Sequence, residues 1–421
     1  MDCTARPGAP CFLVLSASYG GGHQRVAEVL AAQWRSGFPQ AQVDVVDFFE
    51  QFVDPALNRF TRTLYVRSVR HAPRLWGAFY YATGNIRPDS ATQRFINRLG
   101  KARLLAYLHQ RAPHVVVSVH PTPAGSLSEL KGEGKASQPS AVVLTDYAVH
   151  SQWIHPHVDL YCVASEDVRA GLVDRGVPAA RIRVTGIPVD PAFAAPLDRQ
   201  AVARRLGLDP SRTTVLVMAG AYAMLGGILD VHRVLMNLSR RVQAVFVCGR
   251  DEALVERLRH RSRRRADFHV HGFVSNVHEW MAAADLLITK AGGLTVSEAL
   301  VRELPMVIYR PIPGQEEWNT RMLAAAGAAR VARDLEDLRR VVEHLLAEPA
   351  ALESMRRAAR SLGGRTGHRR ASPGGVAGCE LAAPTTHRWW GWWSAPAGRS
   401  CSPCCPTTCG SVSGTACPWW A

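Results

Sequence analysis

Short runs of strand-forming residues alternate with amphipathic helical stretches along most of the chain, and this alternation limits the fold more than any other feature. In an order of this kind, successive strands run parallel and helices cover both faces of the sheet. The first part of the chain predicts an α/β unit with strands at 12–17, 42–47, 115–119, 141–145 and 159–163, and helices at 23–36, within 54–110 and at 166–175.

A second series of the same kind follows a hinge. The segment Val184-Thr-Gly-Ile-Pro-Val-Asp-Pro191 holds two prolines and a glycine, which is typical of a connection between domains. We therefore predict two doubly wound, Rossmann-like domains at 11–190 and 191–362. The second has predicted strands at 214–219, 243–248, 268–270, 285–289 and 305–309, and helices at 199–206, 228–240, 251–263, 277–283, 294–303 and 316–326.

Composition fits two globular domains. The 421 residues are 47% hydrophobic and 20% charged, a balance unlike that of disordered or membrane-spanning chains. No apolar run approaches the roughly 20 residues of a spanning helix, and the run Phe12–Leu15 is too short for the core of a signal peptide. Most of the ten cysteines follow residue 370, so the body has no disulfide framework. We expect a cytoplasmic protein.

The composition changes after about Gly363. Residues 363–421 lack Phe, Tyr, Ile, Asp and Lys, whereas Trp pairs, Cys, Ser, Thr and Pro are frequent. Without aliphatic periodicity this segment cannot bury a core, and we predict a disordered tail. Its cysteines do not repeat the paired spacing of a zinc site, so no metal is predicted.

The chain carries a formal charge of +15 and has a pI near 9.8, which favours an anionic partner. Basic and aromatic residues are mixed along 54–105, as at the interface of an anionic membrane. A solvated basic face is the alternative. No RNA-module signature accompanies the charge, so nucleic acid is not expected. The membrane contacts that we predict are Arg62, Arg67, Arg70 and Trp76.

The first candidate site lies between a predicted strand and a helix. There, Gly20, Gly21 and Gly22 precede His23. Glycines let backbone approach a ligand closely, and the helix N-terminus offers unpaired N–H groups. The turn lacks both G-x-G-x-x-G and a P-loop lysine, so it is not a known nucleotide fingerprint. His23 could act as a base or simply cap the helix.

A second glycine turn follows the strand at 285–289. Gly292 and Gly293 open a helix and can cradle phosphates, and Glu298 lies on that helix, where a carboxylate can accept hydrogen bonds from a ribose diol. The alternative for Glu298 is a favourable charge near a helix N-terminus.

A third segment, 309–319, also begins at the carboxyl end of a strand. It brings an amide and a carboxylate together in Gln315 and Glu316, a pair suited to the hydroxyls of a sugar. Each residue alone could equally be an ordinary helix start.

Together these motifs resemble the glycosyltransferases that make glycosyldiacylglycerols, namely the monogalactosyldiacylglycerol synthases of plastids and the processive diacylglycerol glucosyltransferases of bacteria. The resemblance covers about 12–350. It rests on six segments in the family's order: Gly20-Gly-Gly-His23, the Arg62-to-Gly84 stretch with Trp-Gly-Ala-Phe-Tyr-Tyr, Thr145-Asp146 with His150 and Trp153, Thr185-Gly-Ile-Pro188, Lys290 to Glu298, and Pro313-Gly-Gln-Glu316.

The resemblance implies a GT-B fold, with two Rossmann-like domains facing across a cleft. It also implies inverting transfer, without a bound metal or cofactor, of a hexose from UDP-glucose or UDP-galactose to diacylglycerol at the inner face of the cell membrane. The roles that it implies are base for His23, with Asp146 as the rival; a phosphate or acceptor loop at Gly20 to Gly22; uracil at Phe273 and Val274; pyrophosphate at Gly292 and Gly293; ribose at Glu298; and hexose at Gln315 and Glu316.

Three rival functions stay open at this stage. One is the related transfer of N-acetylglucosamine to the lipid-linked peptidoglycan precursor, although the Pro-Gly-Gln-Glu turn and the Trp76 stretch favour the glycolipid branch. Another is a nucleotide-sugar epimerase. The third is a non-catalytic sugar-nucleotide-binding protein, because the predicted tail stands where the family's C-terminal helix crosses back to the first domain.

Overall fold

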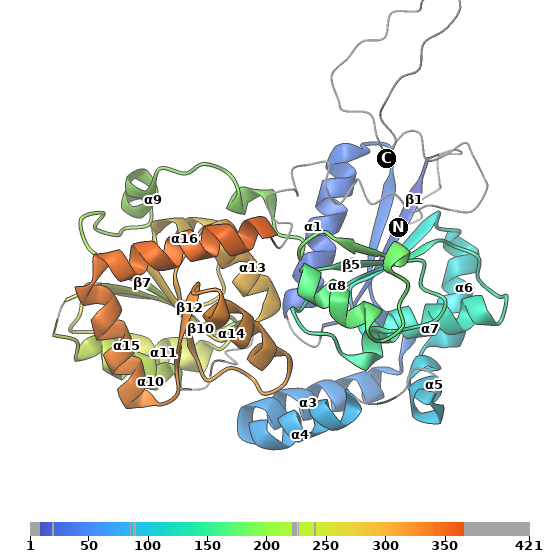
Figure 1. Ribbon diagram of the computed structural model, residues 1–421, viewed down its shortest axis with the longest axis horizontal. Helices are drawn as coiled ribbons and strands as arrows, with labels where there is room; N and C mark the ends of the chain where they lie inside the picture. Colours follow the sequence, from blue (N-terminus) through green and yellow to red (C-terminus); the bar gives the residue numbers. More distant parts are fainter. Residues whose placement is uncertain are drawn as a thin grey trace, which may run out of the picture.

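Two α/β halves make up the protein, each with a parallel six-stranded sheet at its centre (Figure 1). This computed structural model describes residues 9–18, 21–84, 86, 90–220, 225, 227–239 and 241–365, without the side chains of residues 70, 92 and 365. Gly20 and nearly all of the predicted tail lie outside the described residues. The two doubly wound units that the alternation predicts are confirmed, whereas the domain boundaries at 190 and 362 stay predictions.

The first sheet has the strand order β2-β1-β3-β4-β5-β6. Its strands are β1 (Cys11–Ser16), β2 (Gln42–Asp47), β3 (Val115–Ser118), β4 (Ser140–Val143), β5 (Leu160–Val163) and β6 (Ile182–Val184). Its helices are α1 (Gly21–Gly37), α2 (Phe48–Phe52), α3 (Pro55–His71), α4 (Pro73–Thr83), α5 (Ala91–Asn97), α6 (Lys101–Arg111), α7 (Pro121–Gly132) and α8 (Glu166–Val173), with short 3₁₀ turns at Ser151–Trp153 and Ala179–Arg181.

The second sheet has the order β12-β11-β10-β7-β8-β9. Its strands are β7 (Thr214–Met218), β8 (Gln243–Val247), β9 (Phe268–His271), β10 (Leu286–Thr289), β11 (Met306–Tyr309) and β12 (Ala329–Ala332). A 3₁₀ turn at Pro191–Phe193 precedes the helices α9 (Arg199–Arg205), α10 (Ile228–Met236), α11 (Glu252–Ser262), α12 (Val277–Ala283), α13 (Gly293–Val301), α14 (Gln315–Ala325), α15 (Leu335–Ala347) and α16 (Pro349–Arg365).

Some elements were not predicted, for reasons that are visible in the structure. Strands β6 and β12 have only three and four residues and carry Arg183 and Arg330 at their centres, so they lack a strand signature. Helix α7 starts with Pro-Thr-Pro, which a helix tolerates in its first turn, and it is buried almost all round, so it has no polar face to reveal its period. The predicted helical stretch 54–110 is divided into α3, α4, α5 and α6.

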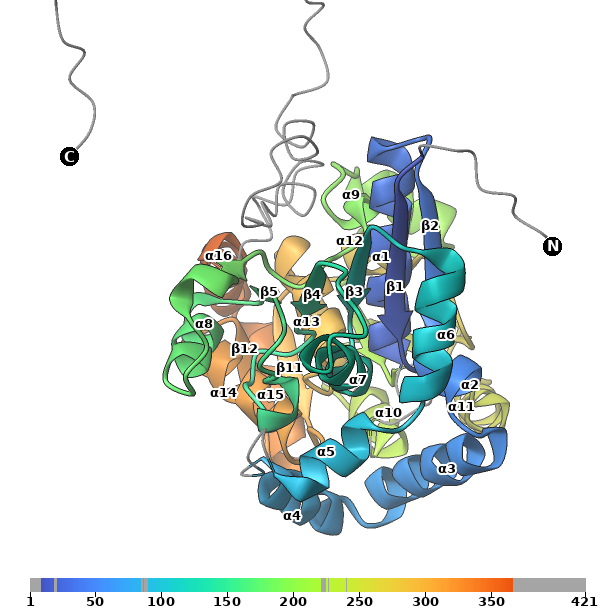
Figure 2. The same ribbon diagram turned by 90° about the vertical axis from the view of Figure 1, so that its right-hand side faces the viewer.

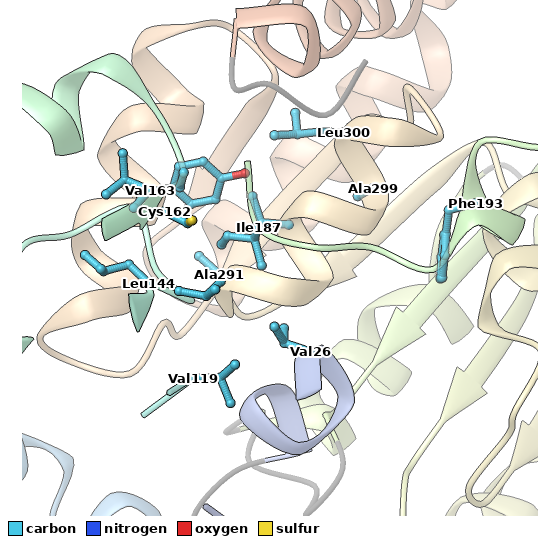
Figure 3. Packing of buried hydrophobic residues seen from close by; sticks show 14 of the residues in the cluster. Val26, Val119, Leu144, Cys162, Val163, Ile187, Phe193, Ala291, Ala299 and Leu300 are labelled. Atoms are coloured by element: carbon cyan, nitrogen blue, oxygen red, sulfur yellow. The ribbon is translucent and has the colours of Figure 1, made fainter. Parts of the chain in front are cut away.

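The core is continuous from one half to the other. Strand β1 is buried on both faces, as helices on both sides of a parallel sheet require. Figure 3 shows side chains of one cluster that come from α1 of the first half, through Val26, and from α13 of the second, through Ala299 and Leu300. The two halves therefore share apolar packing behind the cleft described below.

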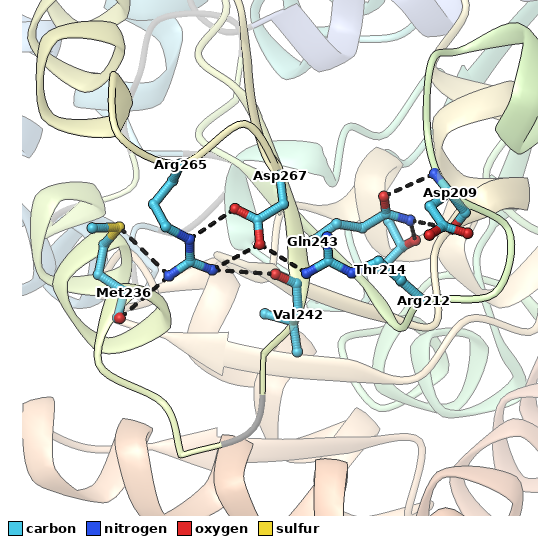
Figure 4. A network of polar contacts seen from close by, with 8 residues as sticks. All are labelled: Asp209, Arg212, Thr214, Met236, Val242, Gln243, Arg265 and Asp267. Carbon is cyan, nitrogen blue, oxygen red and sulfur yellow. Dashed lines mark hydrogen bonds and ion pairs between the residues drawn. The ribbon is translucent and has the colours of Figure 1, made fainter.

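A polar network fixes the beginnings of three strands of the second sheet (Figure 4). Asp267 accepts hydrogen bonds from Arg265 at 2.7 Å and from Arg212 at 2.8 Å, and these guanidinium groups hold the pKa of its carboxyl well below the usual range. The side chain of Gln243 donates to Thr214 Oγ1 at 2.7 Å. These contacts tie β7, β8 and β9 together at their amino ends, and the opposite ends of the strands form the site.

Candidate functional site

A cavity of about 720 Å³ lies at the carboxyl ends of both sheets and is lined by both halves. Ligands of open α/β sheets bind at this edge. Twelve of the residues selected from the sequence line it: Gly21, Gly22, His23, Trp76, Asp146, Phe273, Val274, Gly292, Gly293, Glu298, Gln315 and Glu316. The three motifs, which are distant in sequence, therefore meet at one cavity.

His23 lies on the first turn of α1 and is oriented by a backbone carbonyl. Its Nδ1 lies 2.7 Å from the carbonyl oxygen of Val119 and 3.1 Å from Thr145 Oγ1. A carbonyl oxygen only accepts, so Nδ1 carries the proton of the neutral ring and Nε2 keeps the lone pair. Burial lowers the pKa of His23, and the ring is therefore a neutral base at pH 7.

His120, which the sequence did not single out, lies beside His23. The two ring centroids are 5.0 Å apart in an edge-to-face arrangement. His120 Nδ1 accepts the N–H of Thr122 at 3.3 Å and caps α7. Burial, and then the neighbouring His23, lower the pKa of His120 well below its ordinary value. His120 is therefore neutral beside His23.

The turn at Thr145–Tyr147 closes directly onto the second half. A Cβ added to Gly293 would lie 2.1 Å from the carbonyl oxygen of Thr145, so only glycine fits at the start of α13. Asn319 Oδ1 accepts the N–H of Tyr147 at 3.0 Å, and the hydroxyl of Tyr147 is 3.0 Å from Ser297 Oγ. These contacts hold the turn against the N-terminal ends of α13 and α14.

Asp146 is carried on that turn, at the boundary between the halves. Burial is the main cause that raises the pKa of its carboxyl to about 7, and the negative charge of Glu316 adds to it, whereas Asn319 and Lys290 oppose the shift. Asp146 therefore divides between its charged and neutral forms near pH 7, unlike His23.

The N-terminus of α13 is positively polarised and has no side-chain cap. Gly292 is the N-cap residue, and Lys290 Nζ lies 3.2 Å from the place that a Cβ on Gly292 would take. The Lys290 ammonium pairs with the carboxylate of Glu316. Free N–H groups and a lysine at one point form an environment for an anion. Lys290 was part of the quoted motif but was not selected as a site residue.

Glu298 is buried on α13, with 8% of its surface exposed. Burial raises the pKa of its carboxyl to about 8, partly opposed by Arg25 and further raised by Asp190. Arg25 and Asp190 themselves form an ion pair at 2.8 Å. Glu298 is thus an uncharged acid at pH 7 in the structure as it stands, able both to donate and to accept a hydrogen bond.

Gln315 and Glu316 open α14 beside the cavity. Glu316 is 3% exposed, and its Oε2 accepts the N–H of Ile312 at 2.8 Å. The Oε1 atom of Gln315 is buried and has no hydrogen-bond partner within the described part of the chain. A buried acceptor without a donor costs about 1–3 kcal/mol, so a ligand hydroxyl at this position would remove a real penalty.

Phe273 and Val274 follow β9 at the far end of the cavity. The ring of Phe273 is 62% exposed, and the guanidinium of Arg250 lies 5.5 Å from its centroid. Both Phe273 and Arg250 line the cavity, although Arg250 was not predicted. An exposed ring beside a cation offers a surface on which a flat group can stack.

The four residues predicted to contact a membrane lie on α3 and α4, and their membrane role stays a prediction. Trp76 packs edge-to-face on Tyr65 at 4.9 Å between α3 and α4, facing the cavity. Arg67 is exposed, Arg62 is half-buried, and the side chain of Arg70 is outside the described residues. Helices α3 and α4 also expose apolar side chains: Leu57, Phe60, Leu64, Leu75 and Phe79. No helix in the described part of the chain has the length and apolar character that crossing a bilayer requires.

Two family models match adjoining parts of the chain. Residues 23–189 match the monogalactosyldiacylglycerol (MGDG) synthase model. Residues 214–370 match the model of the glycosyltransferase family 28 C-terminal domain. Each match includes one of the six-stranded sheets, apart from β1 in the first, and together they include the motif residues that line the cavity, apart from Gly21 and Gly22.

Relatives match across most of the chain. A processive diacylglycerol beta-glucosyltransferase of Bacillus cereus is 34% identical over 354 residues, which is 84% of this chain and 90% of that protein. A protein of the same name from Bacillus mycoides matches with the same identity and coverage.

Solved structures share the fold. MurG of Acinetobacter baumannii superimposes with a TM-score of 0.55 over 86% of this chain and 98% of that one, at 16% identity. Alr3699/HepE of Anabaena, in complex with UDP and glucose, gives a TM-score of 0.52 with the same coverage at 14% identity. The two facing sheets, the cavity between them and the 34% identity lead to one conclusion: this chain is a GT-B glycosyltransferase that belongs to the family of the MGDG synthases and processive diacylglycerol glucosyltransferases.

Proposed function

We propose that the protein transfers a hexose from UDP-glucose or UDP-galactose to the hydroxyl of diacylglycerol, with inversion at the anomeric carbon. The observation that carries the proposal is the single cavity in which the motif residues of both halves meet. The relatives are named diacylglycerol beta-glucosyltransferases, and this supports the choice of substrates.

The donor fits the second half of the cavity in one extended pose. Uracil would stack near Phe273 and Arg250 and bond to backbone at Val274, and the ribose diol would reach Glu298. The diphosphate would lie at the N-terminus of α13, where the uncapped N–H groups and the ammonium of Lys290 favour an anion. This pose leaves the hexose at Gln315 and Glu316.

The unpartnered Oε1 of Gln315 supports the hexose position most directly. It needs a donor, and sugar hydroxyls are donors. Glu316 is held by Ile312 and Lys290, so its carboxylate is fixed before the sugar arrives. Preorganised acceptors of this kind discriminate well against ligands that lack the matching hydroxyl.

The reaction needs a base for the acceptor and stabilisation for the leaving group. The acceptor oxygen attacks C1 of the hexose while the bond from C1 to the phosphate oxygen breaks. The proton passes to Nε2 of His23, and UDP leaves with the electron pair. His23 suits this role because the Val119 carbonyl fixes its tautomer and burial keeps it neutral. Lys290 and the α13 dipole offset the charge that develops on the diphosphate.

The acceptor would approach from the first half, along α3 and α4. These helices expose apolar rings and chains, and arginines are interspersed, which suits the anionic cytoplasmic face of a membrane. Tyr65, Trp76 and Tyr80 continue from this surface into the cavity. They offer a path along which a lipid hydroxyl can reach His23 without leaving the bilayer entirely.

A transfer assay with separate donors tests the proposal. Diacylglycerol vesicles would be incubated with labelled UDP-glucose, UDP-galactose or UDP-N-acetylglucosamine, and lipid-extractable label and released UDP would be measured together. We expect equal amounts of lipid-linked hexose and released UDP with one of the first two donors. Transfer only from UDP-N-acetylglucosamine would favour the peptidoglycan-type reaction. Donor binding without any transfer would favour the non-catalytic alternative.

A further inference from the structure

Helix α4 belongs to the first half, yet it packs on the loop of the second half that leads into Gln315 and Glu316. A Cβ added to Gly77 would lie 2.6 Å from Cβ of Pro313. Carbon atoms in contact are normally about 3.5–4.0 Å apart, so residue 77 must be glycine for the helix to lie here. Figure 1 shows α3 and α4 along the lower edge of the molecule, reaching toward the second half.

Two more contacts join the same segments. Gly314 has φ = 105°, and a Cβ added to it would lie 2.7 Å from the ring of Tyr80. The hydroxyl of Tyr81 donates a hydrogen bond to the carboxylate of Glu317. Residues 77, 80 and 81 have the i, i+3, i+4 spacing of one helix face, so α4 presents a continuous surface to the loop.

The C-terminal turn of α4 is fixed to the first half. Ser151 Oγ donates to the carbonyl oxygen of Thr83 at 3.1 Å, and His150 Nε2 lies 3.1 Å from the carbonyl oxygen of Tyr80. Tyr65 of α3 supports Trp76 from the side. The helix is thus held by its own half, and its free face determines where the loop of the other half can lie.

We propose that α4 positions the 312–317 loop for recognition of the transferred hexose, which makes Gly77, Tyr80 and Tyr81 positioning residues of the donor site. The inference rests on the proposed function, in which Gln315 and Glu316 bind the hexose. Most groups assigned to UDP lie elsewhere in the second half, after β9 and on α13, whereas Lys290 touches the loop through its ion pair with Glu316. Disturbing α4 should therefore weaken the hexose contribution to donor affinity more than the UDP contribution.

The test compares binding of UDP with binding of the intact donor. Gly77→Ala inserts a methyl group between α4 and Pro313, whereas Ala78→Val adds bulk to the exposed face of the same helix and serves as the matched control. Titration calorimetry would give the affinities for UDP and for UDP-glucose and UDP-galactose. Loss of one hexose hydrogen bond corresponds to about a tenfold change. We expect Gly77→Ala to weaken donor binding by about that factor relative to UDP, and Ala78→Val to change neither.

A second variant guards against a folding defect in the first. Tyr81→Phe removes the hydrogen bond to Glu317 without adding volume, and we expect a smaller change in the same direction, about threefold. An unchanged ratio of donor to UDP affinity in both variants would overturn the inference, whether the two affinities stay the same or fall equally. Wild-type protein that bound no UDP would instead remove the proposed function, and this inference with it.

Discussion

Replacing His23 by asparagine should slow transfer and leave donor affinity intact. The Nδ1–H of His23 donates to the Val119 carbonyl at 2.7 Å, so Nε2 is the nitrogen that can take a proton. The asparagine amide keeps a donor near that carbonyl but supplies no base. General bases typically contribute about 10²- to 10⁴-fold to a rate, and kcat of His23→Asn should fall by about that factor.

The pH dependence separates His23 from Asp146. Burial lowers the pKa of His23 from 6.5, so its basic form already predominates below that pH and the wild-type rate should be level at pH 7. Burial and Glu316 raise the pKa of Asp146 to about 7. A rate that depended on the Asp146 carboxylate would still be rising through neutrality, because the active form would be gained only there.

The assay is kcat at saturating donor and acceptor for wild type, His23→Asn and Asp146→Asn, from about pH 5 to about pH 9, a range that brackets the pKa of Asp146. UDP affinity measured by calorimetry controls for folding. A His23→Asn rate within about tenfold of wild type, together with a rate limb near pH 7 that disappears in Asp146→Asn, would refute the assignment of His23 and make Asp146 the base.

Three further expectations follow from the site and its surroundings. Glu298→Ala should weaken UDP binding by about tenfold, and the closer mimic Glu298→Gln by less; unchanged calorimetric affinity would remove Glu298 from the site. The pKa of Glu298 is raised from its ordinary value of 4.5 to about 8 in the folded chain, so its contribution to stability is present below about 4.5 and lost as pH rises through about 8; Tm should fall over that range, and less in Glu298→Gln. Sedimentation with anionic vesicles should fall as salt rises. It should also fall when Arg62, Arg67 and Arg70 are neutralised, and fall less when the control set Arg333, Arg339 and Arg340 is neutralised.

The sequence predicted the architecture because its signals are local. Alternating strands and helices, and the hinge near Pro188, require only neighbouring residues to be read. The glycine turns at the ends of β1 and β10 can also be recognised in the sequence, because strand, glycine and helix follow one another. Parallel sheets then place the carboxyl ends of their strands at one edge. For this reason His23, Gly292 and Gln315 could be assigned to one site from the sequence alone.

What the sequence did not reveal depends on contacts between distant segments. His120 and Asn319 are ordinary residues in the chain and gain their places only when β3 and α14 pack beside the cavity. Trp76 was predicted at a membrane surface because aromatic and basic residues are mixed there, and that role stays a prediction. The packing of its ring on Tyr65 and its place in the lining of the cavity depend on how α3 and α4 meet. The close contact between Gly77 and Pro313 could not be predicted from either segment alone.

The anomeric configuration of the lipid product is the sharpest test of the proposed transfer. UDP-glucose and UDP-galactose carry the hexose in α linkage, and a single displacement assisted by His23 must deliver it in β linkage. Glycolipid made by the wild-type protein from diacylglycerol and the preferred donor would be purified and its anomeric proton coupling measured by NMR. We expect a β-glycoside. An α-linked product, or label recovered only as free sugar, would contradict the proposed arrangement of donor, base and acceptor.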